Sequence, residues 1–320
     1  MATRCIAFLA GIALALSAGA QGFPLKPMRL IVPFSPGGIT DASGRVIAQA
    51  LSARLGQQTI VDNRPGASGN IGTQLAANAQ PDGYTLLLVP DSNMLIAPHV
   101  YKNLPFDTVK DFAPVARIGD TALVILANPA GPIRTLQDVM TLAKSQSGGL
   151  SYGTSGIGGN THIVGELFRQ RTGSNLVHVP YKGGGPAMSD LMGGQIPLVI
   201  TAVAGAIPHI KSGKLQALAV PSTKRSESLP DVPTFIESGV PDFFYNSWIG
   251  IFAPARTPQA IVSKLNSELN AVVTTPDVRE KLNGMGIVAT LSKSDQFADE
   301  IKHDLERYGP IIRKAGITQE

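Results

Sequence analysis

The segment Arg29-Leu-Ile-Val-Pro-Phe-Ser-Pro-Gly-Gly-Ile-Thr-Asp41 shows a strand, a glycine-rich turn and a helix start in succession. It opens with an apolar run of strand length, continues with two adjacent glycines and leads into a helical pattern. Thr40 and Asp41 are the expected N-caps of that helix, because their side chains can accept hydrogen bonds from its free N–H groups. Glycines let backbone N–H groups converge beside a helix N-terminus, so residues 34–41, the first corner, are a candidate anion site. In an ordinary turn the same glycines would only supply positive φ.

Two further glycine-rich corners repeat this pattern. The second corner, residues 63–72, follows a strand, as ligand sites do at the carboxyl edge of an open α/β sheet. The third corner, residues 152–162, is the richest in hydrogen-bond donors. His162 would lie in the first turn of the next helix, where the dipole disfavours imidazolium, and a neutral ring could donate to a ligand. A loop of turn formers, and a histidine that only caps or packs, are the plainer interpretations.

Apolar runs of strand length alternate with helical segments along the rest of the chain. This alternation predicts an α/β fold with mainly parallel sheets, because parallel strands need crossover connections that helices provide. A single α/β domain is equally compatible with the periodicity. The expected strands are residues 29–33, 59–62, 84–89, 122–127, 176–180, 198–201, 215–220 and 248–253, and the clearest helical faces are at 46–55 and 297–312.

Composition and the first twenty residues narrow the class of protein. The 320-residue chain is 43% hydrophobic and 16% charged, which is typical of a globular protein, and its net charge of +4 without a basic cluster argues against nucleic acid as a partner. Residues 1–20 combine a positive Arg4, an apolar segment and small residues at Ala18-Gly-Ala20, which predicts a signal peptide rather than a membrane anchor. The only cysteine, Cys5, lies inside it, so the mature, periplasmic chain is expected to lack thiol chemistry and a lipid anchor.

Catalytic and nucleotide-binding motifs narrowly fail at the three corners. None contains the Gly-Lys-Ser/Thr of a P-loop, and a hydrolase elbow around Ser155 would need glycine where Ile157 stands. The five histidines are scattered without metal-ligand spacing. We therefore expect no metal, no cofactor, and capture of an organic acid rather than its conversion. A Ser155–His162 pair in a secreted α/β hydrolase or transferase is the alternative from another class.

The chain resembles the tripartite tricarboxylate transporter substrate-binding family, the Bug-type periplasmic solute receptors. The matching pieces follow one another in order through the whole mature chain, so they do not reflect chance similarity. They are Arg29 to Gly38 with Asp41, Asp62 to Gly72, Pro81 to Leu86, Lys110 to Pro114, Val177 to Gly183, Pro186-Ala187, Leu191 to Gln195, Gly213 to Ala219, Lys224-Arg225, Leu229 to Thr234, Ser247-Trp248, Ala253-Pro254 and Thr257-Pro258.

This resemblance implies a two-domain, Venus-flytrap architecture and a receptor that is not an enzyme. Residues 21–126 plus 247–320 would form the first domain and residues 127–246 the second, with the hinge at the two crossings. The receptor would capture a small carboxylate, either a di- or tricarboxylate or an aromatic carboxylate, for the membrane permease subunits of a tripartite transporter. A monomer is expected, and a ligand sensor for a membrane kinase is the alternative role.

The resemblance also implies which residues meet the ligand, with one carboxylate at the first corner and the far end at the third. The chain departs from the family at Ser35, which replaces a proline and adds a hydroxyl. It departs again at Thr201-Ala202, where members often carry an aspartate, and this weakly disfavours a ligand with an ammonium group. The expected ligand-binding residues are Phe34, Ser35, Pro36, Gly37, Gly38, Asp41, Ala67, Ser68, Gly69, Asn70, Ser92, Thr154, Ser155, Gly156, Gly158, His162 and Thr201.

Overall fold

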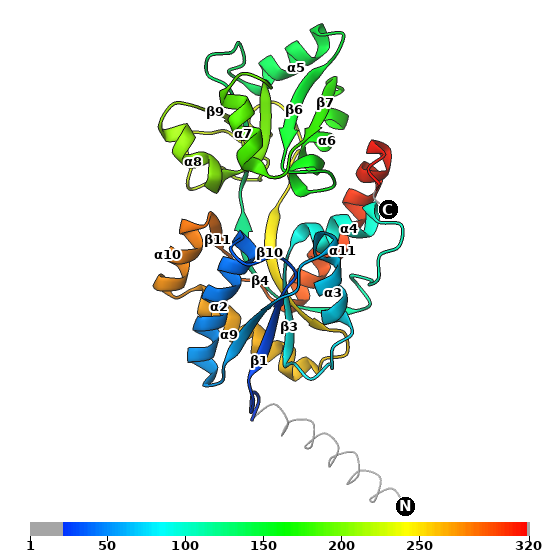
Figure 1. The fold of residues 1–320 in the computed structure, drawn as a ribbon, viewed down its shortest axis with the longest axis vertical. Helices are drawn as coiled ribbons and strands as arrows, with labels where there is room; N and C mark the ends of the chain where they lie inside the picture. Colours follow the sequence, from blue (N-terminus) through cyan, green and yellow to red (C-terminus); the bar gives the residue numbers. More distant parts are fainter. Residues whose placement is uncertain (1–21, 319–320) are drawn as a thin grey trace, which may run out of the picture.

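The computed structural model describes residues 22–318, which form two lobes, each built on its own β-sheet (Figure 1). The signal peptide expected at residues 1–20 lies outside the described residues. Strand order is β11-β4-β10-β3-β1-β2 in the first lobe and β7-β6-β8-β5-β9 in the second. An α/β fold is therefore confirmed, with two sheets rather than one.

The first lobe takes its elements from both ends of the chain. Its strands are β1 (Met28–Val32), β2 (Thr59–Asn63), β3 (Thr85–Pro90), β4 (Phe112–Thr121), β10 (Ser247–Pro254) and β11 (Ile287–Ala289). Its helices are α2 (Ile39–Leu55), α3 (Asn70–Ala77), α4 (Ala97–Val100), α9 (Gln259–Val273), α10 (Pro276–Gly284) and α11 (Ser294–Ala315), with the short helical turns η1 (Ala67–Gly69) and η2 (Ser92–Ile96) before α3 and α4.

The second lobe comes from the middle of the chain. Its strands are β5 (Leu123–Ala127), β6 (Leu150–Thr154), β7 (Leu176–Pro180), β8 (Leu198–Ala202) and β9 (Gln216–Ala219). Its helices are α5 (Leu136–Ser145), α6 (Asn160–Thr172), α7 (Gly184–Met192) and α8 (Val203–Lys211). No helix among residues 22–318 is long and apolar enough to span a bilayer.

All eight strands expected from the sequence are present, but the sheets are mixed rather than mainly parallel. In the first lobe β1 pairs in parallel with β2 and β3, whereas β10 runs antiparallel to both β3 and β4. In the second lobe β6 pairs in parallel with β7 and β8, whereas β5 runs antiparallel to β8 and β9. Two of the reversed strands are ones by which the chain crosses between lobes: β5 continues from β4, and β10 returns from the second lobe without a crossover helix. The third, the edge strand β11, runs antiparallel to β4 within the first lobe.

The chain passes between the two sheets at Ala122, the single residue between β4 and β5. The expected division placed residues 123–126 with the first domain. Their pairing with β8 and β9 places them in the second sheet instead, because β5 fills the gap between these two strands. The chain returns to the first sheet at β10, which begins at Ser247.

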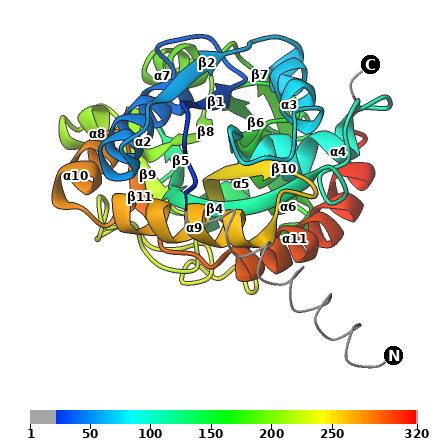
Figure 2. The same ribbon diagram turned by 90° about the horizontal axis from the view of Figure 1, so that it is seen from below.

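Helices cover both faces of the first sheet (Figure 2). α2, α9 and α10 pack against one face of the sheet, and the core between them includes Leu30, Ile249 and Leu265. α3, α4 and α11 lie on the other face, whose core around Trp248 and Phe297 continues into the second lobe. α11 also reaches the second lobe directly, since the side-chain amide of Gln170 on α6 donates to the carbonyl of Ile311 at 3.0 Å.

Candidate functional site

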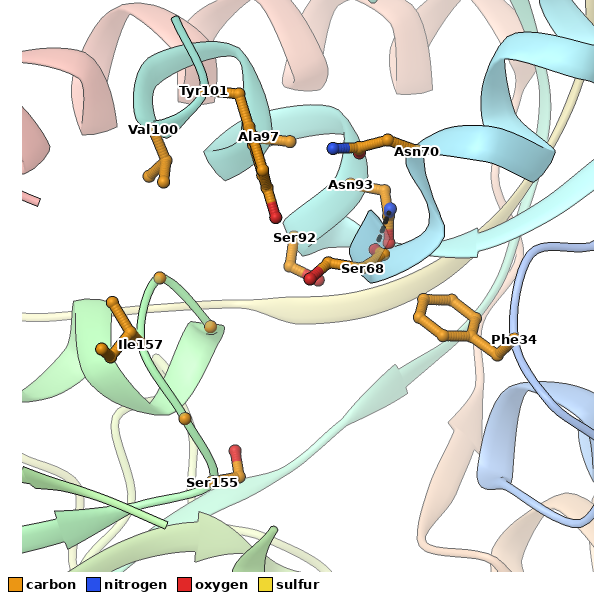
Figure 3. A pocket seen from close by; sticks show the side chains of 13 residues that line it. Phe34, Ser68, Asn70, Ser92, Asn93, Ala97, Val100, Tyr101, Ser155 and Ile157 are labelled. Carbon is orange, nitrogen blue, oxygen red and sulfur yellow. Dashed lines mark hydrogen bonds between the residues drawn. The ribbon is translucent and has the colours of Figure 1, made fainter. Parts of the chain in front are cut away.

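A cavity of about 320 Å³ lies between the two lobes (Figure 3). The first lobe supplies one wall from the start of the first corner, the second corner, η2, α4 and the following Tyr101, and the second lobe supplies the opposite wall from the third corner. Small hydroxyl and amide side chains, backbone of glycines and a few apolar groups make up this lining. The lining residues are Phe34, Ser68, Asn70, Ser92, Asn93, Ala97, Val100, Tyr101, Ser155, Gly156, Ile157, Gly158 and Gly159.

The second corner holds Ser68 in an unusual backbone conformation at the edge of the cavity. Ser68 has φ 55° and lies between Ala67 at 47° and Gly69 at 96°, and non-glycine residues in this region often mark ligand sites. The Asn93 side-chain amide donates to the Ser68 carbonyl at 3.0 Å, which ties the corner to η2. A Cβ on Gly69 would lie 2.7 Å from that amide, so glycine is required here.

Asn70 offers the cavity an amide that the protein itself does not satisfy. It is the first residue of α3, whose N-terminus has no side-chain cap, and its side chain is 95% buried while lining the cavity. Its Oδ1 is buried without a hydrogen-bond partner among the described residues. An unsatisfied buried amide is costly, and such a group beside a cavity is a candidate ligand contact.

The third corner satisfies much of its own backbone with its own side chains. Ser155 N–H donates to the Thr161 hydroxyl at 3.3 Å, Gly156 N–H to the Thr154 hydroxyl at 3.3 Å, and Gly158 N–H to His162 Nδ1 at 3.1 Å. The corner is thereby held rigid in front of α6, whose N-terminus also has no side-chain cap. The Ser155 side chain, by contrast, is exposed and faces the cavity.

His162 is neutral, as expected, but it stabilises the corner and does not line the cavity. Its ring stacks on His178 with centroids 3.7 Å apart, and burial lowers the pKa of His162 to about 4. Burial, together with the neighbouring His162 ring, likewise lowers the pKa of His178 to about 4. His178 Nε2 lies 2.6 Å from the Thr154 hydroxyl. The two stacked rings therefore hold the third corner at two points, His178 at Thr154 and His162 at Gly158.

The first corner differs most from expectation. Thr40 and Asp41 are not N-caps: the N-cap of α2 is Gly38, without a side-chain hydrogen bond. The buried Asp41 carboxylate instead accepts from Gly37 N–H and Asn63 Nδ2, both at 2.9 Å, and from Arg45. Burial alone would raise the pKa of Asp41, but these hydrogen bonds and the Arg45 charge hold it below its usual value. Asp41 therefore positions the corner and leaves no free carboxylate for a ligand.

The structure brings together only part of the expected ligand-binding set. Seven of those residues line the cavity: Phe34, Ser68, Asn70, Ser92, Ser155, Gly156 and Gly158. The exposed Ser35, Pro36, Gly37 and Gly38 lie outside it, as do Ala67 and Gly69 of the second corner, and Thr154, His162 and Thr201 are buried away from it. Sequence reasoning missed Asn93, Ala97, Val100, Tyr101, Ile157 and Gly159; only Asn93, an amide just after a strand, and Gly159 gave a local signal.

A buried hydrogen-bond network joins the cavity to the two strands by which the chain crosses between the lobes. Asp91, which precedes the cavity residue Ser92, is fully buried and accepts from Tyr245 OH at 2.6 Å and from Ser247 Oγ at 3.1 Å. Ser247 Oγ in turn accepts from Thr121 at 2.8 Å and from the side-chain amide of Asn160 at 3.0 Å. Both crossing strands and the start of α6 are thus linked to one carboxyl group. Burial raises the pKa of Asp91 to about 7.

No group of metal-ligating side chains occurs in the part of the chain that the structure describes.

Comparison with known proteins gives consistent matches over nearly the whole chain. The family model of the tripartite tricarboxylate transporter family receptor matches residues 44–317. Protein BugT of Bordetella pertussis is 36% identical over 310 residues, covering 97% of this chain and 95% of BugT. A solved R. palustris protein with adipate has a TM-score of 0.79 at 32% identity, covering 93% of this chain and 100% of that chain. MatC from Rhodopseudomonas palustris with bound malate has a TM-score of 0.75 at 29% identity, covering 91% and 100%.

Proposed function

The chain belongs to the tripartite tricarboxylate transporter receptor family, whose members are solute receptors and not enzymes, and we propose that it captures a small carboxylate between its two lobes. It would do so in the periplasm and deliver the ligand to the membrane permease subunits of a tripartite transporter. The observation that carries this proposal is the cavity itself, which both lobes line with hydroxyl, amide and glycine groups. The adipate and malate complexes of its structural neighbours support a carboxylate as the ligand.

Uncharged donors are sufficient to hold a carboxylate here. Ser68, Ser92 and Ser155 offer hydroxyls, and Asn70 offers its Nδ2 group as a donor, since its Oδ1 can only accept. The uncapped starts of α3 and α6 add positive potential. A hydrogen bond to a charged group contributes roughly 1.5–3 kcal/mol. Micromolar affinity requires about 8 kcal/mol, so about four to six such donors would supply it after ordering costs are subtracted. No buried arginine is needed, which avoids an uncompensated charge in the empty cavity.

Ligand capture would proceed by closure of the two lobes. We propose residues 22–121 with 247–318 as one domain, residues 123–246 as the other, and the crossings near Ala122 and Asn246 as the hinge. On closure the exposed Ser35, Pro36, Gly37 and Gly38 of the first corner would complete the carboxylate site. The ligand stabilises the closed form by as much as its affinity for that form exceeds its affinity for the open form.

The alternative of a hydrolase finds no support in the geometry. Ser155 Oγ hydrogen-bonds Thr161 Oγ1 at 3.0 Å, and His162 Nδ1 is engaged by the Gly158 N–H. A nucleophile–base pair would need a direct hydrogen bond between the Ser155 hydroxyl and the ring, and none occurs within residues 22–318. A sensor role remains a second candidate, because the same closure could dock a membrane kinase.

Titration calorimetry with purified mature protein tests the receptor function. A panel of mono-, di- and tricarboxylates is expected to contain a micromolar ligand, and Ser155→Ala and Asn70→Ala are each expected to weaken it about tenfold or more. Ser189→Ala, on exposed helix α7 outside the cavity, is the matched control. Absence of binding by every carboxylate, or equal weakening by the control, would refute the proposal. Growth on the ligand, lost when the permease subunits are deleted, separates transport from sensing.

A further inference from the structure

The charge balance and the shape of the cavity both bear on which carboxylate it takes. None of the side chains that line it, all within the described residues, carries a full charge at neutral pH. Positive potential comes instead from helix starts, each equivalent to about half an elementary charge. The start of α2 is already opposed by the ionised Asp41, and it lies outside the cavity. The starts of α3 and α6 both reach the cavity, so together they balance about one negative charge.

A second carboxylate would find no counter-charge in this wall. Ser92 follows the buried Asp91, so the nearest charge-bearing side chain in sequence on that side is acidic rather than basic. The side-chain amide of Asn70 is a neutral contact whose Oδ1 is unsatisfied. An ionised group that enters such a site without a partner loses its hydration and gains little in return. The site therefore favours a ligand with a single carboxylate.

An apolar slot adjoins the polar groups of the cavity. Ala97 and Val100 of α4 and the ring of the following Tyr101 form one side, and Ile157 at the tip of the third corner forms the other (Figure 3). The Ile157 side chain is 53% exposed, although it lies in the wall of a cavity. Ser68 and Ser92 lie side by side, and the Tyr101 hydroxyl points toward them (Figure 3). Their hydroxyls lie between this apolar slot and the ring of Phe34, which also lines the cavity.

Building on the receptor function proposed above, we propose that the cargo is a monocarboxylate with an apolar, branched or aromatic body. The carboxylate meets Ser68 and Ser92 of the first lobe, closure brings Ser155 of the opposite wall toward it, and the body fills the slot between Ile157 and α4. On closure the body covers Ile157, and removal of this apolar surface from water contributes to affinity. Polar dicarboxylates would leave the slot unfilled and one charge without a partner.

Calorimetry with four probes tests this proposal. Phenylacetate and 4-methylpentanoate are expected to bind at least tenfold more tightly than adipate and malate. Equal or tighter binding of the dicarboxylates would overturn the monocarboxylate assignment while leaving the receptor function intact. Absence of binding by all four probes, and by every other carboxylate, would refute the receptor function itself.

Two substitutions at one exposed position test the slot without disturbing the core. Ile157→Ala is expected to weaken phenylacetate binding about tenfold, and Ile157→Lys is expected to shift preference toward adipate by adding the missing counter-charge. Ile60→Ala is the matched control, because Ile60 on β2 is 52% exposed and lies outside the cavity. Unchanged phenylacetate affinity in Ile157→Ala, with the same unfolding temperature as the control, would overturn the slot.

Discussion

Replacement of Asp91 by asparagine tests how the hinge network is held together. Asp91 is fully buried at the end of β3 and accepts hydrogen bonds from Tyr245 and Ser247, while Asp304 adds a like charge nearby. Burial raises the pKa of Asp91 from 3.8 to about 7. Asparagine has the same shape and no charge, so Asp91→Asn keeps the packing and removes the titration.

The sign of the effect follows from the direction of this shift. A raised pKa means that the folded state binds the Asp91 proton more tightly than the unfolded state does. The stabilising contribution is therefore complete below pH 3.8 and is lost as the pH rises toward 7. At about 1.4 kcal/mol per pKa unit, the loss amounts to about 4 kcal/mol. The free energy of unfolding of Asp91→Asn, relative to the native protein, should rise by that order between pH 4 and pH 8.

Urea unfolding at several pH values between 4 and 8 measures this difference directly. The difference between variant and native protein isolates Asp91, because other titrating groups contribute equally to both. Asp231→Asn, on an exposed loop, is the control and is expected to show no such trend. A variant-minus-native difference that stays flat from pH 4 to pH 8 would show that Asp91 is ionised in the folded protein throughout, and the reasoning would fail.

Three further predictions concern charged and titrating groups around the site. The pKa of His178 is about 4 in the folded protein and 6.5 ordinarily. Its contribution to the free energy of unfolding is therefore complete above pH 6.5 and is lost as the pH falls toward 4. In urea unfolding, His178→Gln should reduce the loss of stability between pH 6.5 and pH 4. Asp41→Ala removes the acceptor for Gly37 N–H and Asn63, and should lower the free energy of unfolding by about 1–3 kcal/mol. An anionic ligand beside Ser92 should raise the pKa of Asp91 further, so calorimetry in two buffers of different ionisation enthalpy should detect proton uptake at pH 7, absent in Asp91→Asn.

Most of the fold could be predicted because its strands are dense in Val, Ile and Leu. β1, β3, β5 and β8 lie between neighbours in their sheets and show the continuous apolar runs of buried strands. β4 was missed because Pro114, Arg117, Gly119 and Asp120 interrupt its pattern. Those residues are tolerated there because register shifts in the pairing with β10 accommodate them. β6 was missed because its Tyr-Gly-Thr end was assigned to the third corner, and β11 has only three residues.

The candidate site could be predicted only where its chemistry is local in sequence. Glycine-rich corners are recognisable from the sequence, and they predicted five of the cavity-lining residues: Ser68, Asn70, Ser155, Gly156 and Gly158. The wall made by Ala97, Val100 and Tyr101 has no such signal, because apolar residues on a short helix cannot be told from core residues by pattern. Only the folded chain shows that this wall faces Ile157 across a cavity.

The satisfied loop donors explain why glycine corners alone overstate the number of ligand contacts. Sequence reasoning counted backbone N–H groups as free, but Asp41, Thr154, Thr161 and His162 accept from four of them. Buried N–H groups rarely stay unpaired, so an empty site must supply its own acceptors or collapse. Ligand binding is then carried by side chains that keep hydrogen-bonding capacity after this internal pairing: the hydroxyls of Ser68 and Ser92, the Asn70 amide, and the Ser155 hydroxyl beyond its one bond to Thr161. Specificity therefore depends on those side chains and on the apolar wall opposite them, while the glycines determine where they lie.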